Sequence, residues 1–221
     1  MLSKRIKRWS LIVFLLIAAF LSVGLVYLSW AMKQPLYVFG SVNEGSALRG
    51  PLNPPKQTKG DVWRVEKEIE LRFEAHGEGT PVVVVHGGPG VPYASPWTGL
   101  EPLRDRYRFY YYDQRGCGKS TRPFKQFDER KYYDNMIQLE KTLGLGAQIA
   151  DLERIRRILG RDKLTLIGHS FGGLIAMLYA AEFPERVEKL VSAAIRPSLF
   201  PHRDGPRMQT LPRLRFANLE P

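Results

Sequence analysis

Residues 163–173 read K-L-T-L-I-G-H-S-F-G-G, and this stretch decides the fold. Leu164 to Ile167 is a short, apolar, partly β-branched run, which predicts a buried strand. A helix-forming apolar run continues from Leu174 to Ala181, and Pro184 marks its end. The sequence therefore predicts a strand, a sharp turn and a helix in direct succession.

The turn between them holds a G-x-S-x-G pattern, which in this context predicts a nucleophile elbow. Gly168 and Gly172 lie two residues on either side of Ser170, where a side chain would clash in so tight a turn. The elbow would expose the Ser170 hydroxyl above the sheet and direct the Phe171 N–H at a developing oxyanion. The alternative is an ordinary turn serine, but the flanking strand and helix favour the elbow.

Composition indicates a globular chain and gives no sign of a nucleic-acid partner. Of 221 residues, 44% are hydrophobic and 25% charged, enough for one domain with a core. The formal net charge is +11, but residues 1–33 hold five basic groups and no acid, and residues 196–221 hold five basic groups and two acids, which leaves only +3 for residues 34–195. Because the excess is terminal, a nucleic-acid surface is not expected. Cys117 is the single cysteine, which excludes an internal disulfide, and the sequence implies no metal site and no cofactor.

Residues 1–32 are expected to form a transmembrane signal anchor. The uncharged run from Leu11 to Met32 is long enough, at 1.5 Å per helical residue, to cross a hydrocarbon core of roughly 30 Å. Four basic residues precede this run and only Lys33 follows it, which predicts a cytoplasmic N-terminus and an extracytoplasmic domain. A signal peptide cleaved near Ser29-Trp30-Ala31, giving a secreted protein, is the alternative.

Three further regions follow. Residues 33–61 are rich in proline and glycine and are interpreted as a linker. Residues 62–195 are interpreted as the N-terminal portion of an α/β core. Residues 196–221, with five arginines and five prolines, read as the start of a cap or an irregular tail.

Within the core, strand and helix patterns alternate. Residues 62–73 predict a strand or hairpin, residues 77–79 a turn, and residues 81–85, 109–112 and 187–195 further strands. Residues 147–159 predict an amphipathic helix with one apolar face, formed by Ile149, Leu152, Ile155, Ile158 and Leu159. This alternation predicts an α/β fold with a doubly wound, mainly parallel sheet.

Three motifs now stand in order, and together they resemble a known family. They are His86-Gly87-Gly88-Pro89-Gly90, D-Q-R-G-C-G-K-S at residues 113–120, and G-H-S-F-G-G at residues 168–173. The set is similar to the proline iminopeptidase branch of the α/β-hydrolases, over about residues 62–200. The first two motifs are specific to that branch, whereas the serine motif alone indicates only an α/β-hydrolase.

The resemblance implies a role for individual residues. It makes Ser170 the nucleophile and forms the oxyanion hole from the Phe171 and Gly88 N–H groups. The loop at residues 86–90 is then shaped by His86, Gly87 and Pro89, and the resemblance makes His86 a structural residue rather than a catalytic base. Asp113 and Arg115 become candidates for residues in or just behind the site.

The sequence also departs from the family pattern. The peptidases carry G-G-S-W-G around the serine, whereas this chain has Gly-His-Ser-Phe-Gly, common among esterases. The fold places a triad acid and then a histidine after the serine, yet His202 is the only histidine beyond Ser170. We therefore expect a chain truncated before its triad acid and base, neither of which can be assigned.

These observations leave three functions open. The first is a membrane-anchored serine hydrolase acting through an acyl-enzyme on peptides, an aminopeptidase releasing N-terminal proline or a similar residue. The second is an esterase or amidase of the same fold, acting on small esters or amides. The third is a catalytically inactive membrane protein that keeps a hydrolase half-fold for binding. Oligomeric state is not indicated.

Overall fold

The computed structural model describes residues 2–33, 37–46, 48, 50–124, 126–127 and 130–193. The sequence interpretation of residues 196–221 and the expected end of the last strand at residues 194–195 fall outside these ranges. In order along the chain, the elements are α1 (Leu2–Ala31), β1 (Val62–Glu66), β2 (Ile69–His76), β3 (Thr80–Val85), η1 (Thr98–Leu103), β4 (Tyr107–Tyr112), α2 (Tyr132–Leu143), α3 (Leu145–Ile158), β5 (Leu164–His169), α4 (Phe171–Glu182), η2 (Pro184–Arg186) and β6 (Val187–Ala193).

The chain forms two compact units, Met1–Val38 and Phe39–Pro221. The first contains α1, whose segment Leu11–Ala31 is long and apolar enough to cross a membrane. A signal sequence near the N-terminus meets the same criteria of length and composition, so the helix by itself does not distinguish an anchor from a cleaved leader.

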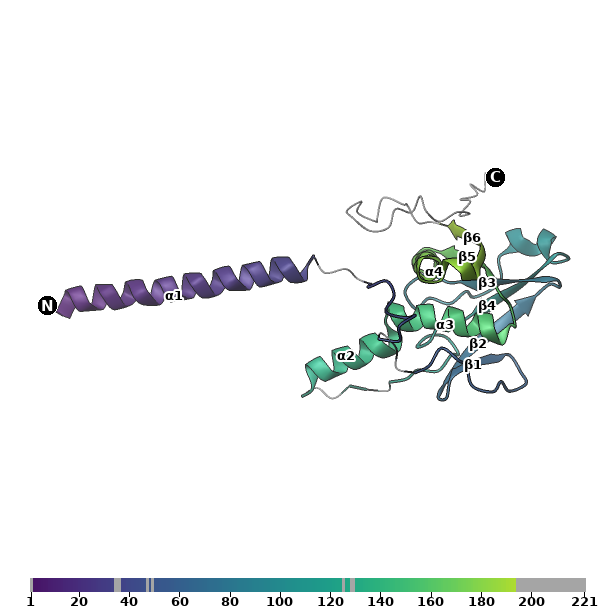
Figure 1. The fold of residues 1–221 in the computed structure, drawn as a ribbon, viewed down its shortest axis with the longest axis horizontal. Coiled ribbons are helices and arrows are strands. Elements are labelled where there is room, and N and C mark those ends of the chain that lie inside the picture. Colours follow the sequence, from purple (N-terminus) through teal and green to yellow (C-terminus); the bar gives the residue numbers. More distant parts are fainter. Residues whose placement is uncertain are drawn as a thin grey trace. The chain divides into compact units, whose positions relative to one another are not determined.

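The second unit is built on one six-stranded sheet with the strand order β1-β2-β4-β3-β5-β6 (Figure 1). β1, β2 and β4 pair antiparallel, and β4, β3, β5 and β6 pair parallel. The predicted hairpin at residues 62–73 is β1 and β2, and the mainly parallel sheet is the one expected from sequence.

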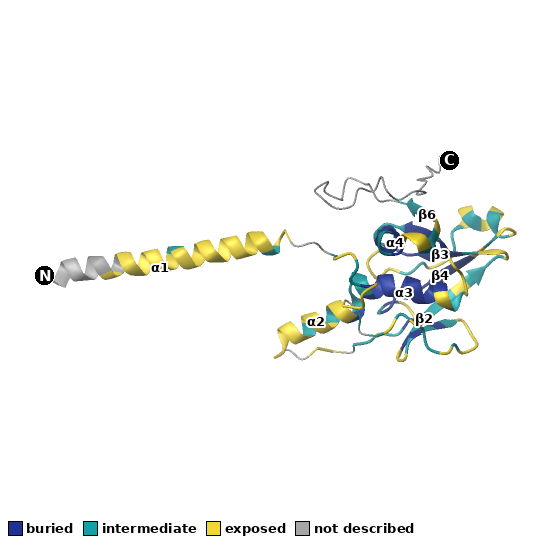
Figure 2. Ribbon diagram, viewed as in Figure 1, coloured by how far each residue is buried: buried dark blue, intermediate teal, exposed yellow. Residues whose placement is uncertain are grey.

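Two layers cover this sheet. α3 and α4 pack against each other and against the strands, and both are buried over most of their length (Figure 2). On the other face, Val82 and Val84 of β3 meet Phe109 and Tyr111 of β4, under the loop and helix around η1. Because side chains alternate along a strand, Val83 and Val85 face the helices, and all four valines are buried. Each such valine stabilises the fold by about 1.5–3 kcal/mol.

The region expected to be a linker up to Asp61 instead belongs largely to the compact unit. We call the described residues between 39 and 57 the strap. The carboxylate of Glu182, at the end of α4, accepts hydrogen bonds from the N–H groups of Gly40 at 2.7 Å, Val42 at 3.1 Å and Asn43 at 2.8 Å. Val42 is fully buried. The globular unit therefore begins at Phe39, because a carboxylate from a distant helix satisfies backbone amides that lack a regular structure of their own.

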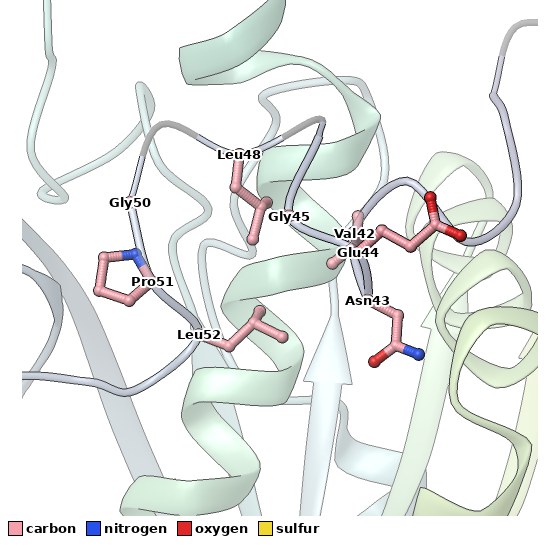
Figure 3. A pocket seen from close by; sticks show the side chains of 8 residues that line it. All are labelled: Val42, Asn43, Glu44, Gly45, Leu48, Gly50, Pro51 and Leu52. Atoms are coloured by element: carbon pink, nitrogen blue, oxygen red, sulfur yellow. The ribbon is translucent and has the colours of Figure 1, made fainter.

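Further along, the strap runs beside α3 and β1. Arg154 of α3 donates to the carbonyl oxygens of Gly50 and Pro51 at 3.0–3.2 Å, and Gln57 exchanges hydrogen bonds with the Arg64 backbone of β1. An open hollow of about 410 Å³ lies within this part of the strap, lined by eight residues between 42 and 52 (Figure 3). Of the described residues that line it, Glu44 alone carries a charge.

Helix α3 differs from its prediction in one respect. Ile149, Leu152 and Ile155 are fully buried as expected, and Ile158 and Leu159 are half-buried. The charged residues on the same helix are buried as well, among them Asp151 and Arg154. The helix is therefore enclosed on almost every side, and not amphipathic, because ion pairs from other elements neutralise its charges.

Candidate active site

Ser170 lies in the sharp turn between β5 and α4, at the carboxyl end of the parallel strands. Its backbone has φ 51° and ψ −124°, and it is the one non-glycine residue with positive φ in the part of the chain that the structure describes. Its N–H donates to the carbonyl oxygen of Ala193 at 2.9 Å, and its carbonyl accepts from the Gly173 N–H at 2.8 Å. The turn thus joins the last residue of β6 to the first turn of α4 through a strained serine.

The two flanking glycines are required by close backbone contacts. A Cβ on Gly168 would lie 2.5 Å from the Gly173 Cα, and one on Gly172 would lie 2.2 Å from the carbonyl oxygen of Val85. Real Cβ atoms do not approach backbone this closely. These contacts are the physical reason for the G-x-S-x-G pattern, because they bring the start of α4 against the end of β3.

The loop after β3 packs directly against the turn. A Cβ on Gly87 would lie 3.0 Å from the Ser170 Cβ and 2.9 Å from the His169 carbonyl oxygen. Gly88 has φ +121°, a conformation open to glycine, and the peptide bond between Gly88 and Pro89 is cis. The missing side chains leave the backbone of this loop next to the serine.

Two backbone N–H groups at this junction have no hydrogen-bond partner among the described residues. Phe171 is the first residue of α4, so its N–H has no acceptor within the helix. The Gly88 N–H, in the neighbouring loop, has no acceptor either. Unpaired N–H groups beside a serine are the arrangement that can stabilise an oxyanion.

His86 is buried beneath the same loop, and both of its ring nitrogens are engaged. Nδ1 donates to the Gly87 carbonyl oxygen at 2.9 Å, and Nε2 accepts the Gln114 N–H at 3.0 Å. Burial lowers the pKa of His86, which keeps the ring neutral and suits this pattern. Neither nitrogen is therefore available to take a proton from Ser170.

The residue that holds His86, Gln114, was not singled out from the sequence. Besides its backbone bond to the ring, its side-chain amide donates to the His86 carbonyl oxygen at 2.8 Å, and it is buried. The only signal was its place in the D-Q-R-G motif. Beside it, the Asp113 carboxylate accepts the Lys119 N–H at 2.7 Å and so closes the loop at residues 113–120.

The Arg115 side chain, from the same loop, binds residues of other elements and does not point into the serine turn. Its guanidinium donates to both carboxylate oxygens of Asp151 at 2.6 and 2.7 Å, to Glu66 at 2.7 Å and to the Thr142 carbonyl oxygen at 2.9 Å. Burial alone would lower the pKa of Arg115, but the two carboxylates outweigh it and raise that pKa. Arg115 therefore ties the loop that holds His86 to α3, β1 and the end of α2.

Aromatic side chains form a wall on the sheet face beside the turn. The Trp97 ring meets the His169 ring edge-on at 5.8 Å, and Tyr93 contacts both Trp97 and Tyr111 edge-on at 5.3 and 5.7 Å. Burial raises the pKa of Tyr93 and Tyr111, so both hydroxyls stay neutral at pH 7. His169, next to the serine in sequence, lies against this wall.

Within the described residues, the Ser170 Oγ has no hydrogen-bond partner, and no cluster of three or more His, Cys, Asp or Glu side chains could hold a metal. The site as described therefore contains a half-buried serine with a strained backbone and two N–H groups that have no partner among the described residues.

Comparison with known proteins agrees with this geometry. Residues 80–216 match the family model described as the alpha/beta hydrolase fold. A proline iminopeptidase of Heyndrickxia coagulans is 35% identical over 121 residues, which cover 54% of this chain and 36% of that protein. A proline iminopeptidase of Neisseria meningitidis is 35% identical over 141 residues, covering 61% of this chain and 40% of that protein.

The similarity is not confined to peptidases. A 2-hydroxy-6-oxo-2,4-heptadienoate hydrolase of Pseudomonas putida is 34% identical over 125 residues, covering 56% of this chain and 40% of that protein. In each case the match spans less than half the length of the relative.

Proposed function

Since the chain belongs to the α/β hydrolase fold family, we propose that it is a serine hydrolase whose nucleophile is Ser170. The observation that carries the proposal is the strained conformation of this serine, at φ 51° between β5 and α4. Strain of about 1–3 kcal/mol persists in a fold only where the surroundings impose it, and here the turn is held between the loop after β3 and the end of β6.

The chemistry follows from the arrangement of the turn. The Ser170 Oγ attacks a substrate carbonyl carbon while a general base takes its proton, and the carbonyl oxygen becomes an oxyanion. The N–H groups of Phe171 and Gly88 stabilise that oxyanion, since neither has another acceptor among the described residues. On collapse the base gives its proton to the departing amine or alcohol, which leaves an acyl-enzyme. Water, deprotonated by the same base, then cleaves the acyl-enzyme, and Ser170 regains its proton.

The described residues do not supply a triad base after the nucleophile, since none of those beyond Ser170 is a histidine. In this fold the triad acid and base both follow the nucleophile, in the order acid and then histidine. His86 is excluded from the role by its two ring hydrogen bonds.

For the substrate, we propose a peptide with N-terminal proline or a similar small residue, released by aminopeptidase action. Support comes from the H-G-G-P-G and D-Q-R-G-x-G-x-S motifs and from two relatives that are named proline iminopeptidases. An esterase or amidase acting on small esters or amides is the second candidate, favoured by Gly-His-Ser-Phe-Gly at the turn. A non-catalytic binding protein is the third, in keeping with the absence of a described base.

For location, we propose that α1 remains as a single-pass anchor, with the N-terminus in the cytoplasm and the second unit outside it. The basic residues before the apolar run support this orientation. Secretion after cleavage of α1 is the alternative. No nucleic-acid partner is proposed.

Labelling with a fluorophosphonate tests the nucleophile. We expect the protein from the full reading frame to be labelled, Ser170→Ala to lose the label, and Ser46→Ala, which removes an exposed hydroxyl in the strap, to keep it. A folded wild-type protein that does not react would favour the non-catalytic candidate. Release of nitroaniline from proline nitroanilide, compared with hydrolysis of nitrophenyl acetate, separates the aminopeptidase from the esterase.

A further inference from the structure

Helix α2 presents apolar side chains to solvent. The exposed fractions are 67% for Tyr132, 81% for Tyr133, 46% for Met136 and 54% for Ile137, and we call these four residues the α2 face. Figure 2 shows α2 mainly in the exposed colour, in contrast to α3 beside it. Large exposed apolar side chains gathered on one helix indicate a binding surface and not ordinary surface variation.

The four residues lie together on the helix. At 100° per residue they occupy an arc of about 140°. The side of the helix toward the rest of the unit carries Thr142, the buried residue of α2, and the half-buried Leu139. Before the helix in sequence, Phe127 is 44% exposed, and its ring packs at a tilt against Phe124 with ring centroids 5.1 Å apart.

Charge does not explain the α2 face. Among the described residues, the exposed charged ones on and beside the helix are Arg130, Lys131 and Lys141 against Asp134 and Glu140, so neither sign dominates. Glu140 lies one turn beyond Met136 on the same side of the helix. A surface rich in tyrosine, methionine and isoleucine, with charges of both signs around it, suits an apolar partner with a polar boundary. The interfacial zone of a bilayer has that chemistry, and tyrosine is enriched there.

The N-terminal unit indicates which partner is within reach. α1 contains a segment that could cross a membrane and ends at Ala31, while Glu182 holds the strap from Gly40 onward. Only seven residue steps separate Lys33 from Gly40. A fully extended chain of that length spans at most about 25 Å. An anchored chain would therefore keep the second unit close to the bilayer surface.

We propose that the α2 face inserts into the outer interfacial layer of the same bilayer that α1 crosses. This rests on the anchoring proposed above. An amphipathic helix whose apolar side chains enter the boundary between headgroups and acyl chains binds in proportion to its buried apolar area. Docking would give the second unit a fixed orientation on the membrane, in place of free rotation about a short connection.

The test uses the full chain in phosphatidylcholine vesicles, with single cysteines labelled by a bimane maleimide. Tyr133→Cys reports on the α2 face, Gln138→Cys on the exposed polar side of the same helix, and Leu21→Cys on the middle of α1. The native Cys117 is buried, and burial raises the pKa of its thiol to about 11, so it does not compete for the label at pH 7.

Spin-labelled phosphatidylcholine then quenches the probes that contact lipid. We expect quenching at residue 21 and at residue 133, with quenching at residue 133 at least about twofold stronger than at residue 138. Quenching at residue 21 with equal, weak quenching at residues 133 and 138 would overturn docking and leave the anchor intact. No quenching at residue 21 would overturn the anchor and docking together. A probe at residue 133 that resists aqueous iodide without being quenched by lipid would show that protein covers the α2 face.

Discussion

A Cβ on Gly172 would lie 2.2 Å from the carbonyl oxygen of Val85, which means that α4 begins in contact with the backbone of β3. This contact holds the serine turn against the loop at residues 86–90. Two segments that are far apart in sequence form one rigid corner, and the candidate active site lies on it.

Gly172→Ala should therefore prevent the corner from closing. The added methyl group meets backbone oxygen atoms of Val85 and His86, which cannot move aside as a flexible side chain can. We expect loss of several kcal/mol of unfolding free energy or failure to fold. Urea denaturation measures the loss, with Gly99→Ala as the control, since a Cβ on Gly99 meets nothing within 4 Å. Equal stability of the two variants would contradict the close contact.

Ser170→Gly should stabilise the protein relative to Ser170→Ala. Both variants lack the hydroxyl, but only glycine accepts φ 51° without strain, so the difference isolates the strain stored at the turn. We expect about 1–3 kcal/mol, reduced by the larger entropy that glycine gives the unfolded chain. The measurement is the denaturation midpoint of each variant. A less stable Ser170→Gly protein would show that the turn is relaxed.

Glu182→Gln should loosen the strap. The carboxylate accepts three backbone N–H groups, and an amide presents one acceptor oxygen in place of two. We expect a loss of about 1–3 kcal/mol and faster proteolytic cleavage between residues 39 and 46. Glu185→Gln is the matched control, because its ion pair with Arg186 is exposed and contributes little. Cleavage at equal rates in both variants would mean that the Glu182 carboxylate does not hold the strap in place.

We expect the Glu153 carboxylate to contribute to the free energy of unfolding at neutral pH and to lose that contribution in acid. Burial alone would raise the pKa of Glu153, but hydrogen bonds from Arg156, Arg157 and Tyr179 outweigh it and hold that pKa below 4.5. A carboxyl group with a depressed pKa stabilises the fold above its unfolded pKa, and this contribution is lost as the pH falls through the folded value.

Wild type should therefore exceed Glu153→Gln in stability at pH 7, and the gap should narrow as the pH falls below about 4.5. Urea denaturation of the two proteins between pH 7 and pH 3.5 measures the gap. A gap that stays constant across this range would mean that the carboxylate is not the source of the stability.

The strands and the serine turn could be predicted from sequence because their causes are local. A run such as residues 81–85 needs only its own side chains to indicate a buried strand, and the spacing of Gly168 and Gly172 reports a clash within a few residues. The hairpin of β1 and β2 was likewise visible in the alternation of residues 62–73.

The strap and the burial of α3 could not be predicted in this way. Gly40 is held by a carboxylate 142 residues away, and nothing in its own proline- and glycine-rich surroundings indicates that partner. Asp151 and Arg154 look like the solvent face of an amphipathic helix. They are buried because each has an ion-pair partner on another element. Arg115, in the loop at residues 113–120, pairs with Asp151, and Glu66 of β1 pairs with Arg154. Helix α2 is absent from the sequence predictions, although Tyr132, Met136, Leu139 and Leu143 recur at helical spacing.

The hydrogen bond from the Ser170 N–H to the Ala193 carbonyl oxygen has a mechanical consequence. It extends the ladder between β5 and β6 by one rung, so the serine is tied to the end of the last described strand. A displacement of β6 at Ala193 would shift the Ser170 backbone directly through that hydrogen bond, without involving α4. The position of β6 therefore bears directly on the backbone conformation of Ser170.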